Sequence, residues 1–417
     1  MTFKTILNQV YKLKSFVYGT ARIVETAKGK ELEVEISPRA NGKPKCSSCG
    51  YHGGCYDHLP ERRYEFIPLW GMRVFFLYSP RRVNCHCCGI IVEKVPWADG
   101  KHQESIPYKL FLAHWAKKLS WQEVAIQFRS TWDQVFSAIE YVVHWGLEHR
   151  DLSGITAIGV DEICTNKGHH YATVVYQIDA HCRRLLWVGQ KRTTKTLLKF
   201  FRDMGSEVTA DIQYICSDMW KPYLTVIKKK LPNAIHILDR FHIVANLNKA
   251  LDKVRATESK KLAADGYEPV LKGARWCFLK KTDNLTQNQQ YSLKQLLQYN
   301  LKSVRAYLLK EDFQQLWKYS SPYWAGKFLD AWCTRAMRSQ IDPLKTQARS
   351  IRKHRQLILN WFTAKKRFNS GIVEGLNGKA KLTMRKAFGF RTFNALQIAL
   401  FHQLGDLPQP ELAHKFF

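Results

Sequence analysis

Residues 155–162 read ITAIGVDE, and this stretch decides the fold expected for the centre of the chain. Its apolar run, Ile155–Val160, ends directly in Asp161. A second apolar run, Ile212–Ser217, ends in Asp218 in the same way. Short apolar runs of this length are typical of buried strands, and ligand groups in α/β sheets gather where such strands end. We therefore expect two strand ends that each present a carboxylate.

The elements around these strands follow the order β-β-β-α-β-α-β-α. The expected strands are Ile155–Val160, Tyr171–Asp179, Arg184–Gln190, Ile212–Ser217 and Ala234–Leu238, and the expected helices are Thr194–Met204, Pro222–Lys230 and one from about Phe241. From about Asn246 to Trp361 the apolar residues repeat with a helical period throughout. Strands joined both directly and through helices predict a mixed α/β sheet, and a long helical segment follows it.

A third acidic residue, Glu374, lies in the stretch NSGIVEGLN, which has the pattern of a helix that Asn369 or Ser370 can cap. On that helix Glu374 shares a face with Asn377 and Lys381, at positions i, i+3 and i+7. An acid in such basic surroundings needs a cationic partner. That partner is either an arginine or a metal ion.

Asp161, Asp218 and Glu374 together suggest a chemistry. Two carboxylates at strand ends and one on a helix can converge to hold a pair of Mg²⁺ (or Mn²⁺) ions. Such a pair activates one oxygen and stabilises another in an in-line phosphoryl displacement. The three acids therefore predict metal-dependent phosphoryl transfer.

A fourth acid, Asp239, also follows an expected strand, and it lies three residues before His242 on the next helix. This pair could hold a water or a scissile phosphate, or it could make only a structural hydrogen bond. Both interpretations stay open.

The cysteines are concentrated near the beginning of the chain. Six of the 11 lie between Cys46 and Cys88, in two CxxC pairs formed by Cys46, Cys49, Cys85 and Cys88. Four thiolates in two such pairs are typical of a closed structural Zn²⁺ site. Cys87 could replace Cys88, and Cys55 or His58 could also contribute. The alternative is a set of buried, reduced cysteines without metal.

Three helices are expected between Tyr108 and about Leu147, after a connector at Pro96–Pro107. Ser/Thr-x-x-Glu/Gln capping boxes mark the start of the second and third helices, at Ser120–Glu123 and Thr131–Gln134. Short turns between such helices are typical of a helix-turn-helix, whose recognition helix would begin at Trp132 and present Asp133 and Gln134. A plain helical spacer remains the alternative. Residues 1–45, with alternating apolar positions, read as short strands.

The charge of the chain points to nucleic acid. There are 65 Lys and Arg against 35 Asp and Glu, a net charge of +30, with a hydrophobic share of 45% that excludes a disordered basic tail. The chain contains no apolar run long enough for a membrane span and no secretory signal at Met1–Lys14, so we expect a cytoplasmic protein. A solvated basic face is the competing interpretation.

Several side chains are candidates for contact with DNA. The segment Lys345–Arg391 contains 13 Lys or Arg, among them Lys379, Lys381 and Arg385 close to Glu374. These three could bind backbone phosphates. Three aromatic residues, Trp187, Trp220 and Tyr223, could stack on an unpaired base, although core packing is the more ordinary role of each.

With these motifs in view, the chain resembles bacterial insertion-sequence transposases of the ISL3 family. The resemblance is carried by the CxxC pairs, the helix-turn-helix and the stretches GVDE at 159–162, SDMW at 217–220, DRFH at 239–242, VEGLNGKAK at 373–381 and GFR at 389–391. It implies an RNase H-like core with Asp161, Asp218 and Glu374 as its DDE triad. It also implies that Asp239 and His242 form the (C/D)-x-x-H element of related enzymes.

The resemblance also implies a multidomain α+β architecture. The expected domains are a zinc-binding domain at 1–100, a helix-turn-helix at 101–150, the first part of the core at 151–245, a helical insertion at 246–355 and the second part of the core at 356–417. The implied activity is strand cleavage and transfer at the terminal inverted repeats of an element and at target DNA, by a homodimer in the synaptic complex. A regulator that binds DNA without cutting it and a nuclease for RNA or branched DNA are the alternatives.

Overall fold

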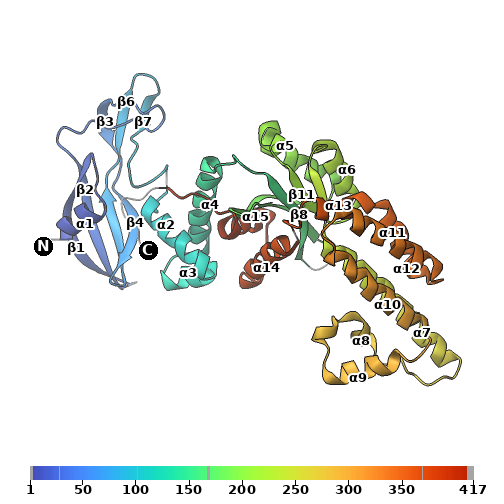
Figure 1. Cartoon of the computed structure of the whole chain (residues 1–417). Helices are drawn as coiled ribbons and strands as arrows, with labels where there is room; N and C mark the ends of the chain where they lie inside the picture. Colours follow the sequence, from blue (N-terminus) through green and yellow to red (C-terminus); the bar gives the residue numbers. More distant parts are fainter. Residues whose placement is uncertain (1–2, 28, 101, 167–169, 369, 411–417) are drawn as a thin grey trace. The chain divides into compact units, whose positions relative to one another are not determined.

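The computed structural model describes residues 3–27, 29–100, 102–166, 170–368 and 370–410. By its contacts the chain forms two compact units, one from the described parts of Met1–Asp151 and Leu382–Phe417, the other from Leu152–Lys381. Both units combine sheets and helices, so the expected multidomain α+β class is confirmed (Figure 1). The expected division into five domains stays a prediction. The contacts separate Leu382–Phe417 from the remainder of the predicted last segment.

The first unit begins with two sheets in which every strand pair is antiparallel except β2 with β5. One has the strand order β1-β2-β5-β4 and the other the order β3-β6-β7. Their bounds are β1 Phe16–Thr26, β2 Gly29–Pro38, β3 Gly54–His58, β4 Arg62–Leu69, β5 Met72–Tyr78, β6 Arg81–Cys85 and β7 Gly89–Val92. Alternate residues of the larger sheet, such as Val34, Val74 and Phe76, are buried in one core, as the period of two along a strand requires.

The expectation of short strands only in residues 1–45 is wrong at the start of the chain. Phe3–Val10 forms a helix, α1. Its apolar residues Phe3, Ile6, Leu7 and Val10 recur at i, i+3, i+4 and i+7, which is the helical period. Leu7 is buried in the core of the larger sheet, so tertiary packing stabilises this short helix.

The three expected helices are present as α2 (Ile106–Lys118), α3 (Trp121–Gln127) and α4 (Trp132–His149). Both predicted capping boxes are confirmed, with Ser120 and Glu123 at the start of α3 and Thr131 and Gln134 at the start of α4. The last helix of the chain, α15 (Phe393–Leu404), packs on α4 within the same unit.

The second unit is built on a mixed five-stranded sheet in the order β10-β9-β8-β11-β12. Its strands are β8 Ala157–Asn166, β9 His170–Ile178, β10 Arg183–Gln190, β11 Tyr214–Ser217 and β12 Ile235–Leu238. β9 runs antiparallel to its neighbours β8 and β10, while β8, β11 and β12 are parallel. The β-β-β-α-β-α-β-α order expected from the sequence is confirmed, with helices α5 (Thr194–Ala210), α6 (Lys221–Lys230) and α7 (Arg240–Ala264).

The two faces of β8 have different neighbours. Ile158 and Val160 point into a core shared with α5 and α6. Gly159 points to the opposite face, where a Cβ atom would lie 2.5 Å from Cγ2 of Val373 in α14 (Ser370–Lys386). Because side chains alternate along a strand, Asp161 lies on the face of β8 that α14 approaches.

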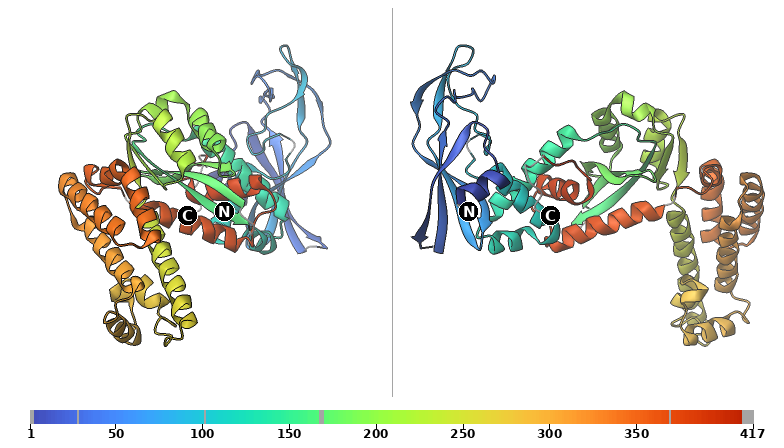
Figure 2. Two further views of the ribbon diagram at one scale, coloured as in Figure 1. Left: turned by 90° about the vertical axis from the view of Figure 1, so that its right-hand side faces the viewer. Right: turned by 60° about the vertical axis from the view of Figure 1, so that its left-hand side comes forward.

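The remainder of this unit is a helical segment, which Figure 2 shows as long helices running away from the sheet. It comprises most of α7 together with α8 Arg275–Leu279, α9 Gln287–Leu296, α10 Lys302–Gln314, α11 Pro322–Arg338, α12 Asp342–Lys353 and α13 Arg355–Thr363, and the short 3-10 turns η1 Thr282–Asn284 and η2 Gln315–Lys318. Asn360 of α13 donates a hydrogen bond to the backbone carbonyl of His236 in β12. In the described part of the chain, no helix has the length and apolar character that crossing a membrane requires.

Candidate active site and cysteine cluster

Three of the predicted acids meet at one edge of the mixed sheet. The parallel strands β8, β11 and β12 direct their carboxyl ends to the same edge. Asp218 follows β11 and Asp239 follows β12 directly. Each of the two also accepts a hydrogen bond from a backbone N–H two residues later, on Trp220 and Phe241. The turns after both strands therefore fix the orientation of the two carboxylates.

The expected position of Asp161 at the end of its strand is wrong. β8 continues to Asn166, and Asp161 pairs with Val174 of β9 inside it. The parallel neighbour β11, however, pairs with β8 only as far as Gly159. Asp161 is thus the second residue beyond that pairing. Its carboxylate lies at the sheet edge although its backbone is still in a strand.

Asp161 is held by a residue of α14. Its Oδ2 accepts a hydrogen bond of 2.7 Å from the amide of Asn377, whose oxygen accepts one of 2.8 Å from the hydroxyl of Tyr176. Burial raises the pKa of Asp161 to about 6, against the lowering effect of the Glu162 backbone N–H, and the carboxylates of Asp239 and Asp218 add to the increase. A half-buried carboxylate near other acids is a site that a cation would stabilise.

Glu374 reaches the same site from α14, one residue after Val373, which packs over Gly159. Burial raises its pKa, and the charge of Asp239 raises it further, while His242 and Arg240 lower it. Glu374 therefore lies in the electrostatic field of Asp239, which follows β12. The capping role predicted for Asn369 and the side chain of Ser370 lies outside the described residues.

Asp239 and His242 interact as their spacing predicts. Asp239 begins α7, and its Oδ2 lies 3.4 Å from Nε2 of His242. Asp239 is buried, whereas the His242 side chain is 38% exposed. The ring can therefore contact a substrate as well as the carboxylate.

Sequence reasoning missed one cation of the site entirely. Arg192, between β10 and α5, forms ion pairs of 2.6 Å with Glu162 and 2.9 Å with Asp218. Its guanidinium also lies 4.2 Å from the ring centroid of Trp220. Burial raises the pKa of Glu162 to about 7, although Arg192 opposes that increase. The available signal was weak, because Arg192 is only one of two basic residues that follow the third strand of the sheet.

The oxygen donors at the sheet edge are of the type that Mg²⁺ prefers. Among the described residues, however, no three carboxylate or imidazole donors lie within 4.8 Å of one another. The acids are thus related by their shared sheet edge and by electrostatic effects, and they are less compact as a ligand group than the cysteines.

The four predicted cysteines form the closest group of potential metal ligands in the described chain. The sulfur atoms of Cys46, Cys49, Cys85 and Cys88 all lie within 4.8 Å of one another. Two tight turns present them, and each turn ends in a glycine with positive φ, Gly50 and Gly89. The backbone N–H of Cys49 lowers the pKa of Cys46 to about 7, whereas, against the lowering effect of the Tyr51 backbone, the adjacent sulfur of Cys85 raises the pKa of Cys49. The group contains Cys88 rather than Cys87, and four sulfur donors this close fit a tetrahedral zinc ion.

The residues predicted to contact DNA differ in how exposed their side chains are. Lys379, Lys381 and Arg385 are exposed on α14. Gln134 uses its side chain in the capping box of α4. Trp132 stacks on Phe136 with ring centroids 5.4 Å apart and is 41% exposed.

The aromatic residues near the sheet are largely packed. Trp187 and Tyr223 are buried in the core beneath α5 and α6. Trp220 is partly buried against that core and contacts Tyr223 edge to face. Only Trp220 of the three therefore retains a surface on which a base could stack.

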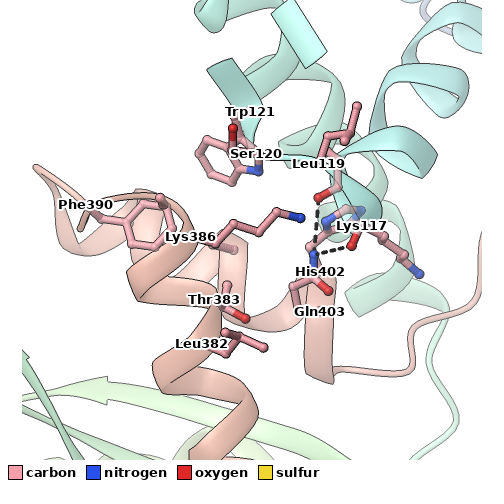
Figure 3. A pocket seen from close by; sticks show the side chains of 13 residues that line it. Lys117, Leu119, Ser120, Trp121, Leu382, Thr383, Lys386, Phe390, His402 and Gln403 are labelled. Carbon is pink, nitrogen blue, oxygen red and sulfur yellow. Dashed lines mark hydrogen bonds between the residues drawn. The ribbon is translucent and has the colours of Figure 1, made fainter. Parts of the chain in front are cut away.

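A pocket in the first unit lies between the end of α2, the start of α3 and the helices α14 and α15 (Figure 3). Gln403 donates hydrogen bonds to the backbone carbonyls of Ala116 and Lys117 across it. Burial lowers the pKa of His402 to about 3, so its imidazole is neutral. The residues that line this pocket belong to the first unit, whereas the candidate catalytic acids belong to the second.

Comparison with known proteins identifies relatives along most of the chain. The family model for ISL3 transposases matches residues 158–400, which include the three acids of the predicted triad. The chain is 29% identical over 378 residues to the transposase of insertion sequence IS1001 from Bordetella parapertussis, covering 90% of this chain and 92% of that one. It is 30% identical over 395 residues to the transposase of IS1557 from Mycobacterium tuberculosis, covering 88% of this chain and 87% of that one.

Proposed function

Because the chain belongs to the ISL3 family of transposases, we propose that it cleaves the ends of its insertion element and joins them to target DNA by a DDE mechanism. Asp161, Asp218 and Glu374 are the proposed triad, in an RNase H-like core. The observation that carries the proposal is geometric: Asn377, one turn after Glu374 on α14, donates a hydrogen bond of 2.7 Å to Asp161 at the sheet edge where Asp218 also lies. The raised pKa values of Asp161 and Glu374 support it. The mixed order of that sheet, with β8 at its centre, supports the core assignment.

The proposed cofactors are Mg²⁺ or Mn²⁺ at the acids and Zn²⁺ at the four cysteines. Asp161, Asp218 and Glu374 would hold two divalent ions, which, when bound, activate the attacking oxygen and neutralise the charge of the leaving one. The protein's own task is then to place these carboxylates correctly. Asn377 orients Asp161, and the backbone of Trp220 orients Asp218.

His242 is the proposed contact to the scissile phosphate or to its water. Its ring is half exposed and lies beside Asp239, which can accept a hydrogen bond from one ring nitrogen and so orient the other toward the substrate. A structural hydrogen bond alone would not require an exposed ring. The exposed charges of α14, which continue the helix beyond Glu374, are the proposed path for the DNA backbone.

The first unit is the proposed DNA-end recognition module. Its helices α2, α3 and α4 have the capped, short-turn arrangement of a helix-turn-helix. The zinc site is proposed to stabilise the fold around the smaller sheet, because the turn with Cys85 and Cys88 joins β6 to β7 and Cys46 forms a bridge with Glu93, just beyond β7. A homodimer bound to both element ends is the proposed active assembly.

The test is strand cleavage on labelled DNA that carries the ends of the element. Asp161→Asn, Asp218→Asn and Glu374→Gln should each abolish cleavage and leave end binding intact, because the amides keep the size of the side chain but lose its charge. Asp211→Asn, at the exposed end of α5, is the matched control and should cut normally. Appreciable cleavage by any one of the three variants removes that residue from the triad. Equal DNA binding without any cleavage by the wild type would favour a regulator instead.

A further inference from the structure

Arg192 makes the closest ion pairs at the edge of the sheet. Its Nη1 lies 2.6 Å from Glu162 and its Nη2 lies 2.9 Å from Asp218. The side chains are 25%, 16% and 11% exposed, respectively. The other oxygen of Asp218 accepts the backbone N–H of Trp220. Both oxygens of this proposed metal ligand are therefore already engaged, one of them by a permanent positive charge.

The backbone around Arg192 is fixed on both sides. Lys191 adopts a positive φ of 72°, and its N–H and carbonyl bind the carbonyl of Tyr171 and the hydroxyl of Thr173 in β9. Thr193 caps α5 by accepting the N–H of Thr196. A strained residue held by two hydrogen bonds indicates that the loop conformation is specified. The guanidinium is thus directed to the acids by the fold and not by a mobile surface chain.

The position of this guanidinium has an electrostatic consequence. It neutralises part of the negative charge that a divalent ion would otherwise meet at Asp218. Its charge also repels any cation that binds the same carboxylate, with an energy that falls with distance as Coulomb's law requires. An arginine keeps its charge at every physiological pH, so the effect is constant.

We propose that Arg192 is the built-in counter-cation of the acidic site, which keeps Asp218 and Glu162 together in the metal-free protein and lowers the affinity of that site for divalent ions. The inference rests on the proposed function, because it assumes that Asp218 is a metal ligand. Arg192 acts through Asp218 and is a positioning residue. Within the described structure its Nε is buried without a hydrogen-bond partner, so the guanidinium retains a donor for a further acceptor.

The experiment measures Mn²⁺ binding by the full-length, zinc-loaded protein, using the electron paramagnetic resonance signal of free Mn²⁺ and no DNA. Arg192→Gln removes the charge, Arg192→Met removes it while keeping an aliphatic chain against Trp220, and Arg192→Lys retains it. We expect Arg192→Gln and Arg192→Met to bind Mn²⁺ on the order of tenfold more tightly than the wild type, the size that Coulomb's law gives for one charge about 5 Å from a divalent ion in a water-like medium. Arg192→Lys should stay within about threefold of the wild type, because its charge remains.

Two further variants separate the possible failures. Arg202→Gln makes the same change in net charge on α5, at a side chain that is 76% exposed, and should leave Mn²⁺ binding unchanged. Asp218→Asn should weaken Mn²⁺ binding. If it does not, the proposed metal site itself is wrong.

If Asp218→Asn weakens binding but both neutral variants of Arg192 bind Mn²⁺ no more tightly than the wild type, the inference is overturned and the proposed function stands. Weaker binding by the neutral variants would mean that Arg192 only orients Asp218 for the ion. A misfolded variant cannot gain affinity at an assembled site, so a gain supports the inference regardless of small changes in stability.

Discussion

The contact between Gly159 and α14 determines where Glu374 lies, and Gly159→Ala tests it. The new Cβ atom would lie 2.5 Å from Cγ2 of Val373, whereas ordinary contacts begin at 3.4 Å, a deficit of 0.9 Å (3.4 − 2.5). Val373 is β-branched and has essentially one rotamer on a helix, so it cannot rotate away. The helix must therefore shift by most of that distance.

Two magnitudes follow from this shift. Overpacking of this kind costs about 1–3 kcal/mol in the free energy of unfolding. Glu374 follows Val373 directly, and a displacement of about 1 Å at a reacting centre can cost on the order of 100-fold in rate. We therefore expect Gly159→Ala to lose more in strand cleavage than its loss of stability explains.

The assays are urea denaturation and cleavage of end DNA, both on purified protein. Gly375→Ala is the control for stability, because it adds the same methyl group to α14 where no atom lies within 4 Å; it should stabilise the helix by about 1 kcal/mol. Val373→Ala alone removes two buried methyl groups and should cost about 2 kcal/mol. Combined with Gly159→Ala it removes the clash.

The double variant Gly159→Ala with Val373→Ala should recover cleavage relative to Gly159→Ala, and its stability loss should be smaller than the sum of the single losses. Wild-type cleavage by Gly159→Ala would refute the reasoning. So would a double variant that cleaves no better than Gly159→Ala, because α14 would then not rest on this residue.

Three further predictions concern other parts of the chain. Cys46→Ser should reduce the zinc content from one ion per chain to none, as measured by elemental analysis, while Cys87→Ser should retain it; the opposite pattern would require another ligand set. Lys381→Ala combined with Arg385→Ala should weaken binding to all DNA sequences alike and flatten the dependence of log affinity on log salt by about two units, at roughly 0.9 per phosphate contact; an unchanged slope would mean that these charges only face water. The pKa of Asp161 is raised to about 6, so the folded protein binds this proton more tightly than the unfolded chain, in which the pKa is about 4. In Mg²⁺-free buffer the unfolding free energy should therefore fall as the pH rises from about 4 through 6. Asp161→Asn should show less of this decline in urea denaturation, and an identical pH profile would place the raised pKa elsewhere.

The sequence alone determined the features that depend on neighbouring residues. The capping boxes at Ser120 and Thr131 were predictable because a helix end is satisfied by side chains within three residues of it. The strand and helix order of the second unit was predictable because apolar residues repeat with the period of each element. The helix α1 also has apolar residues with a helical period, but the alternating residues after it led us to expect strands. These apolar residues are Phe3, Ile6, Leu7 and Val10.

The candidate acids were also accessible from the sequence. Asp161, Asp218 and Asp239 each follow an apolar run, and parallel strands bring such positions to one edge. Glu374 was found because it is the one acid in a basic segment. Glu374 is more than 100 residues from the nearest of them, so its approach to the other acids was a hypothesis from residue type that the family resemblance reinforced.

Only the tertiary structure decided which side chains hold these acids. Asn377 was visible as a neighbour of Glu374 on a helix face, but its hydrogen bond joins Asp161, 216 residues away. Arg192 has no local pattern that distinguishes it from the other arginines, and its partners come from β8 and the turn after β11. The choice of Cys88 over Cys87 likewise depends on the direction in which a turn presents adjacent thiols. Local periodicity determines elements and their order, because backbone hydrogen bonds and caps act over a few residues. Contacts between distant segments depend on sheet register and helix packing, and no short stretch of sequence encodes those.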